Sequence, residues 1–92
     1  MMPTDRVRRT TKAAWQELEG ETILLVTDEE KLLGLNPVAG RIWQLADGTR
    51  TVEEIAARIE AEFAADGRVV RDDALRFVNR LLARGLMERC EG

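Results

Sequence analysis

The hydrophobic pattern of the chain changes its period after the first third of the sequence. Up to that point, short apolar stretches alternate with polar turns, over residues 14–18, 21–26 and 31–35. Stretches rich in branched and aromatic residues predict β-strands. Glu19 and Gly20 fit a two-residue hairpin turn between the first two strands, because glycine accepts a positive φ. Short connections between consecutive strands predict an antiparallel meander.

Three helices are predicted after these strands. Asn36 and Pro37 begin the first, because Asn can cap a helix and Pro suits its first position. Thr51 and Glu54 have the spacing of a capping box and begin the second helix. The third helix is expected over residues 72–84. The order of three strands and then three helices predicts the α+β class, with the helices covering a three-stranded antiparallel sheet.

Three glycines are expected to end the helices. Gly48 and Gly67 each follow an aspartate and break the first and second helices, and Gly85 is the natural C′ residue of the third. The chain of 92 residues makes one domain. We expect a flexible basic N-terminal arm over residues 1–12 and a single folded domain over residues 13–92.

Composition excludes several function classes. The net charge is −3, which argues against a general nucleic-acid binder. The N-terminal arm is instead positively charged, because it holds Arg6, Arg8, Arg9 and Lys12 and only one acidic residue, Asp5. It is expected to be a solvated tail. No apolar run has the length of a membrane span and no secretory signal is evident, so a cytoplasmic location without membrane contact is predicted.

The sequence offers little for catalysis. It has no histidine and one cysteine, Cys90, so the commonest general base and metal ligand are missing. The carboxylate pairs at residues 53–54 and 72–73 lie in the first turns of predicted helices, where acidic residues complement the helix dipole. No glycine-rich phosphate loop is present. We therefore expect a protein that is not an enzyme and that holds no metal or cofactor.

The third predicted strand is an edge strand of the meander. Leu32, Leu33 and Leu35 put apolar side chains on both of its faces, since alternate residues point in opposite directions. Gly34 has no side chain, so another backbone could approach closely. An apolar edge of this kind is a template for a further strand, unless a helix covers it.

The third predicted helix has a wide apolar face. At 100° per residue this face spans about 160°, whereas a core-facing stripe needs roughly 100°. Phe77 lies at one side of it, next to Asp73, Arg80 and Arg84. The helix is therefore either a wall of a groove or more deeply buried than average.

Several segments together carry a resemblance to a known family. They are residues 15–20 (WQELEG), 32–37 (LLGLNP), 41–45 (RIWQL), 47–55 (DGTRTVEEI) and 73–78 (DALRFV). Their ordered set resembles the pyrroloquinoline quinone synthesis protein D (PqqD) family, also known as RiPP recognition elements, from about residue 13 onward. The resemblance implies a winged-helix-like domain of three strands and three helices.

The resemblance also implies a function. Members bind the leader of a ribosomally made precursor peptide as a strand added to the third strand, in a groove closed by the third helix, and present it to a modifying enzyme, often a radical S-adenosylmethionine protein. Carried over to this sequence, the peptide-binding residues are Lys31, Leu32, Leu33, Gly34, Leu35, Asp73, Phe77, Arg80, Leu81 and Arg84. Asp28-Glu29-Glu30 stands where the pyrroloquinoline quinone subgroup tends to carry a Pro-Glu pair, so the pathway stays open.

Two alternatives remain at this point. A winged-helix DNA-binding protein would use Arg76, Arg80 and Arg84 with the basic arm. An obligate dimer or domain-swapped pair would use the same edge strand for self-association. For the peptide-recognition domain, the expected partners are a precursor peptide and its modifying enzyme, no nucleic acid, and a monomeric or weakly dimeric state.

Overall fold

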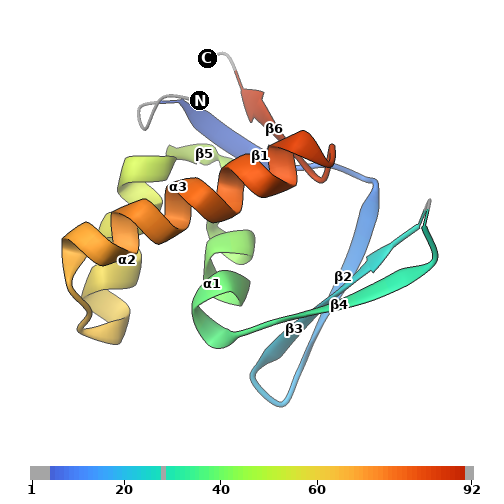
Figure 1. Ribbon diagram of the computed structural model, residues 1–92, viewed down its shortest axis with the longest axis horizontal. Coiled ribbons are helices and arrows are strands. Elements are labelled where there is room, and N and C mark those ends of the chain that lie inside the picture. The colour runs from blue at the N-terminus through green and yellow to red at the C-terminus, as the bar shows by residue number, and fades with distance from the viewer. Residues whose placement is uncertain (1–4, 28, 91–92) are drawn as a thin grey trace.

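The computed structural model describes residues 5–27 and 29–90, which form strands and helices of an α+β protein (Figure 1). The described elements are β1 (Arg6–Arg9), β2 (Ala13–Leu18), β3 (Glu21–Val26), β4 (Lys31–Leu35), α1 (Pro37–Leu45), β5 (Asp47–Thr51), α2 (Val52–Phe63), α3 (Gly67–Ala83) and β6 (Met87–Cys90). The strands form two three-stranded antiparallel sheets, where the sequence predicted a single one.

The predicted meander is present as the sheet β2-β3-β4, here called the meander sheet. Glu19 and Gly20 both have positive φ, 52° and 83°, as a type I′ hairpin turn requires. The register sets Trp15 opposite Leu24 and Leu24 opposite Leu33. The sequence prediction of an antiparallel meander with β4 at its edge is confirmed.

The second sheet, here called the terminal sheet, has the order β5-β1-β6 and was not predicted. Its central strand β1 lies within the segment expected to be a flexible arm, and Val7 is fully buried. Residues 1–4 of that segment lie outside the described part of the chain. A four-residue strand with one apolar side chain has no readable period, and its partner β6 lies at the other end of the chain. Local sequence therefore could not predict the pairing.

Helices α1 and α2 begin where the sequence predicts. The Asn36 side chain accepts a hydrogen bond from the Ala39 N–H at 2.8 Å, with Pro37 in the first position. The Thr51 hydroxyl accepts from the Glu54 N–H at 3.1 Å, and the Glu54 carboxylate accepts from the Thr51 N–H at 3.0 Å. Hydrogen bonds from the Thr51 backbone and side chain lower the pKa of the Glu54 carboxyl below its usual range. The capping box is therefore confirmed.

Helix α3 is longer than predicted at its start. Gly67 is its first residue rather than a breaker, because the Asp66 carboxylate caps the helix by accepting from the Arg68 N–H at 2.9 Å. At the other end Gly85 has a φ of 73° and donates its N–H to the carbonyl of Leu82. This is the αL stop that the sequence predicts.

Helix α1 connects the two sheets, since it runs from the end of β4 to the start of β5 (Figure 1). It packs closely on the meander sheet: a Cβ placed on Gly40 would lie 2.5 Å from the Thr22 hydroxyl oxygen. Glycine is therefore required at this contact, because any side chain would push the helix off β3. Beyond it Ile42 and Trp43 are buried in the core.

Arg9, at the end of β1, binds the other end of α1. Its guanidinium donates hydrogen bonds to the carbonyl oxygens of Trp43 at 2.9 Å and Gln44 at 2.8 Å. The same group lies 5.3 Å from the centre of the Trp15 ring on β2. A cation at a helix C-terminus satisfies free carbonyls and complements the dipole. Arg9 thus joins both sheets to α1, although the sequence suggested a solvated arginine.

We predict that Arg9→Ala lowers the free energy of unfolding by roughly 1.5–3 kcal/mol, the usual range for hydrogen bonds to a charged group. Urea denaturation followed by circular dichroism measures the change. The matched control is Arg8→Ala, which removes an exposed ion pair with Glu88 and should cost about 0–1 kcal/mol. Equal losses for the two variants would contradict the role given to Arg9.

Candidate functional site

The free edge of β4 is the first component of the site. β4 pairs with β3 on one side, and no strand in residues 5–27 or 29–90 pairs with its other side. The strand is flanked by Asn36, which begins α1. An unpaired strand edge offers a row of backbone donors and acceptors to another chain.

The hairpin fixes which backbone groups of β3 point toward β2. Leu18 and Glu21 flank the two-residue turn, and residues in that position exchange backbone hydrogen bonds. The pattern recurs at every second residue, and the Thr27 N–H continues it by donating to the Lys12 carbonyl at 3.1 Å. The odd-numbered residues of β3 therefore bond to β2, and the even-numbered ones face β4.

This alternation determines what β4 presents at its edge. Leu24 of β3 lies opposite Leu33, so Leu33 directs its N–H and C=O toward β3. Leu32 and Gly34 alternate with it and direct theirs away from β3, toward the free edge. These two residues are the ones whose backbone can bond to an added strand.

The side chains of β4 divide between two faces, as the sequence predicts. Leu33 and Leu35 are half-buried and pack against the core. Leu32 points to the opposite face and is 70% exposed. A Cβ on Gly34 would meet no atom within 4 Å. The face that carries Leu32 is therefore sterically open at Gly34.

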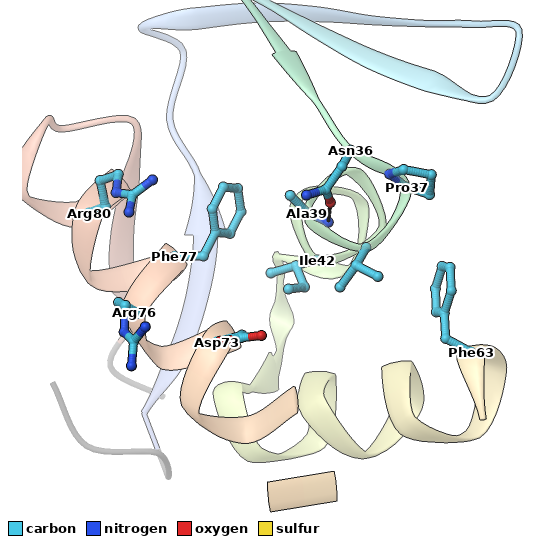
Figure 2. A pocket seen from close by; sticks show the side chains of 10 residues that line it. Asn36, Pro37, Ala39, Ile42, Phe63, Asp73, Arg76, Phe77 and Arg80 are labelled. Atoms are coloured by element: carbon cyan, nitrogen blue, oxygen red, sulfur yellow. Dashed lines mark hydrogen bonds between the residues drawn. The ribbon is translucent and has the colours of Figure 1, made fainter. Parts of the chain in front are cut away.

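A pocket of about 620 Å³ lies between α1 and α3 next to the end of β4. Phe77 projects from α3 toward the first turn of α1, and Phe63 at the end of α2 borders another side (Figure 2). The lining side chains are Asn36, Pro37, Val38, Ala39, Ile42, Phe63, Asp73, Arg76, Phe77 and Arg80. Apolar walls with a few polar groups suit an apolar side chain of a ligand.

The predicted residues of α3 have different positions. Asp73, Phe77 and Arg80 line the pocket, and their role in peptide binding stays a prediction. Leu81 is 3% exposed and belongs to the core, so its side chain is not on a groove surface. The Arg84 guanidinium donates a hydrogen bond at 2.9 Å to Glu29, which lies in the turn between β3 and β4. The ion pair joins the C-terminal end of α3 to the turn that leads into β4.

Sequence reasoning missed several residues of the pocket. The sequence predicts the first turn of α1 only as a helix start, and it gives no binding role to Phe63, which is 39% exposed and lines the pocket. Arg76 was considered only for DNA contact. A bulky aromatic residue in the last turn of its helix, next to the break before Asp66, was the available signal for Phe63.

The polar groups of the site can form hydrogen bonds and ion pairs with a ligand, but they are not arranged as a metal site. Within the described residues no group of three His, Cys, Asp or Glu side chains is placed to hold a metal ion. The helices of the same residues are also too short or too polar to cross a membrane. What the site offers is a backbone edge, an apolar pocket and a charged rim.

Solved structures of similar fold come from peptide-maturation systems. TbiB1 in complex with the TbiA(beta) leader peptide has a TM-score of 0.77 and 27% identity, covering 92% of this chain and 99% of that one. Lasso peptide synthetase B1 complexed with the leader peptide has a TM-score of 0.77 and 17% identity, covering 90% and 98%. The PqqD truncation of Methylobacterium extorquens PqqCD, described as a stand-alone RiPP recognition element, has a TM-score of 0.72 and 24% identity, covering 97% and 100%.

Sequence comparisons give the family. A search of curated protein sequences finds no match. The family model described as coenzyme PQQ synthesis protein D (PqqD) matches residues 21–87, which include β3, β4, all three helices and the pocket between them. By this match the chain belongs to the PqqD family.

Proposed function

We propose that this chain binds the leader of a ribosomally synthesised precursor peptide as a fourth strand on β4 and presents it to a modifying enzyme. The observation that carries the proposal is the open edge of β4 beside the apolar pocket of α1 and α3. TbiB1, which shares 27% identity with this chain, is described in complex with a leader peptide. The domain then acts by holding the substrate close to the enzyme and raising its effective concentration.

The backbone supplies affinity that tolerates sequence variation. A strand added to β4 would pair with the N–H and C=O groups of Leu32 and Gly34, as in other β-augmentation complexes. Selectivity comes from side chains, because alternate residues of the added strand point toward the groove. An apolar leader residue there would contact Phe77 and the half-buried Leu33.

The charged rim favours acidic leader residues. Arg80 is exposed on the pocket side of α3, next to Phe77 (Figure 2). Arg84 is 32% exposed at its side chain and already has Glu29 as a partner. Arg80 is therefore the stronger candidate for an electrostatic contact with the peptide, and Arg84 contributes mainly by holding the turn before β4.

Peptide recognition accounts for the observations better than DNA binding. The net charge is −3, and Arg71 of α3 and Arg84 at its C-cap are paired with Glu53 and Glu29. We propose a non-catalytic, cytoplasmic domain of winged-helix-like topology, monomeric or weakly dimeric, whose partner enzyme is often of the radical S-adenosylmethionine class in this family. The pathway is set by the precursor and the enzyme.

We predict that Gly34→Pro weakens leader binding by about tenfold or more, roughly 1.4 kcal/mol. Proline removes the N–H that points to the free edge and places its ring in the path of the added strand. Gly34→Ala is the control, since it keeps the N–H and its methyl group meets no atom within 4 Å. Titration of a labelled leader against both folded variants measures the difference. A folded Gly34→Pro protein with wild-type affinity would rule out strand addition at this edge.

We also predict that Arg80→Glu weakens leader binding by about threefold to tenfold, roughly 0.7–1.4 kcal/mol, because a repulsive charge replaces an attractive one. The control is Arg71→Glu, an equal charge change on the side of α3 that faces Glu53 of α2. Titrations at low and high salt measure both variants, and the Arg80 effect should shrink with salt. Equal effects of the two substitutions would show that net charge, not the rim, governs binding.

A further inference from the structure

The face of the meander sheet opposite the core is unusually apolar. Here the outer face means Leu18, Ile23, Leu25 and Leu32, whose side chains alternate with the buried Leu24 and its neighbours in register. Leu18 is 48% exposed, Leu25 41% and Leu32 70%. Each of the three strands thus contributes a large apolar side chain to the same exposed face.

These side chains gather at one place. Of the six large apolar residues exposed in the described chain, three belong to the outer face and line a single hollow of about 340 Å³: Leu18, Leu25 and Leu32. Scattered apolar residues on a surface are ordinary, whereas a contiguous patch marks an interaction site. The core side of this sheet is occupied by α1, so the hollow is separate from the pocket described above.

The patch is continuous with the edge proposed to receive the leader. The side chain of Leu32 lies on the outer face, and its backbone N–H and C=O point to the free edge of β4. A strand added to β4 would extend the sheet, and every second side chain of that strand would project on the outer face, with one of them beside Leu32. A protein that covers the outer face would therefore contact the domain and its bound peptide together.

Charge at the patch is of one sign. Glu19 and Glu21 are exposed at the β2–β3 turn. The positions of β2, β3 and β4 that face outward carry no Lys or Arg. A surface with an apolar centre and basic residues around it would complement this patch. A second copy of the chain would bring the same two acidic residues and no complementary charge.

We propose that the outer face is the docking surface for the enzyme that modifies the bound peptide, and that the enzyme meets it with an apolar patch flanked by Lys or Arg. This rests on the proposed function, because the enzyme is the protein to which the leader must be presented. The enzyme should bind the domain more tightly when the leader is present, because the added strand enlarges the surface that the enzyme contacts.

The test uses the double substitution Leu18→Ser with Leu25→Ser, which lies outside β4. The probes are a labelled leader peptide and the purified enzyme that modifies it. We expect leader affinity within about twofold of wild type and enzyme affinity reduced at least tenfold, and wild type should bind the enzyme more tightly when loaded with leader. The control Val69→Ser removes an apolar residue that is 56% exposed on α3, and should change neither affinity.

The outcomes separate the inference from the proposed function. If the double variant folds and binds the enzyme as tightly as wild type, the docking surface is wrong while leader binding stands. If wild type binds no leader, both are overturned. If sedimentation shows a wild-type dimer that the double variant abolishes, a second copy covers the face and the inference is overturned. Reduced enzyme affinity for Glu19→Lys with Glu21→Lys would support the basic rim assigned to the enzyme.

Discussion

The close approach of Gly40 to Thr22 is the contact on which the geometry of the candidate site depends. It holds α1 directly against β3, with no room for a side chain between them. The first turn of α1 is one wall of the pocket, and β4 leads into it through Asn36. If α1 moved outward by the thickness of a methyl group, the wall and the free edge would both shift relative to α3. Arg9 then holds the opposite end of the same helix.

The candidate site combines a backbone edge on β4 with side chains on α3. Backbone groups of β4 offer hydrogen bonds that any extended peptide can use, whereas under the proposed function Phe77 and Arg80, which line the pocket from α3, would distinguish between peptides by shape and charge. The two parts belong to elements that are far apart in sequence, and the Arg84–Glu29 ion pair links them at one end.

Local signals in the sequence were sufficient for the meander sheet, the caps and the helix stop. Glu19-Gly20, Asn36-Pro37, the Thr51–Glu54 box and Gly85 each act within a few residues of themselves, and each has its predicted role. The terminal sheet was missed because its strands are short and pair across nearly the whole chain. Leu81 was misplaced for a related reason: helical periodicity gives the apolar face of α3, but only packing against other elements decides which part of that face is covered.

The pairing of β1 with β6 has a consequence for the order of folding. Arg6 lies opposite Cys90, so the central strand of the terminal sheet gains this neighbour only after almost all of the chain has been synthesised. The meander sheet and α1 make contacts between nearby residues and can form earlier, because short loops close at lower entropic cost. During translation β1 would therefore lack one of its two neighbouring strands until β6 is made. A nascent chain in that state presents an unpaired edge of β1 to its surroundings, and its yield in the cell would depend on how fast the last strand arrives.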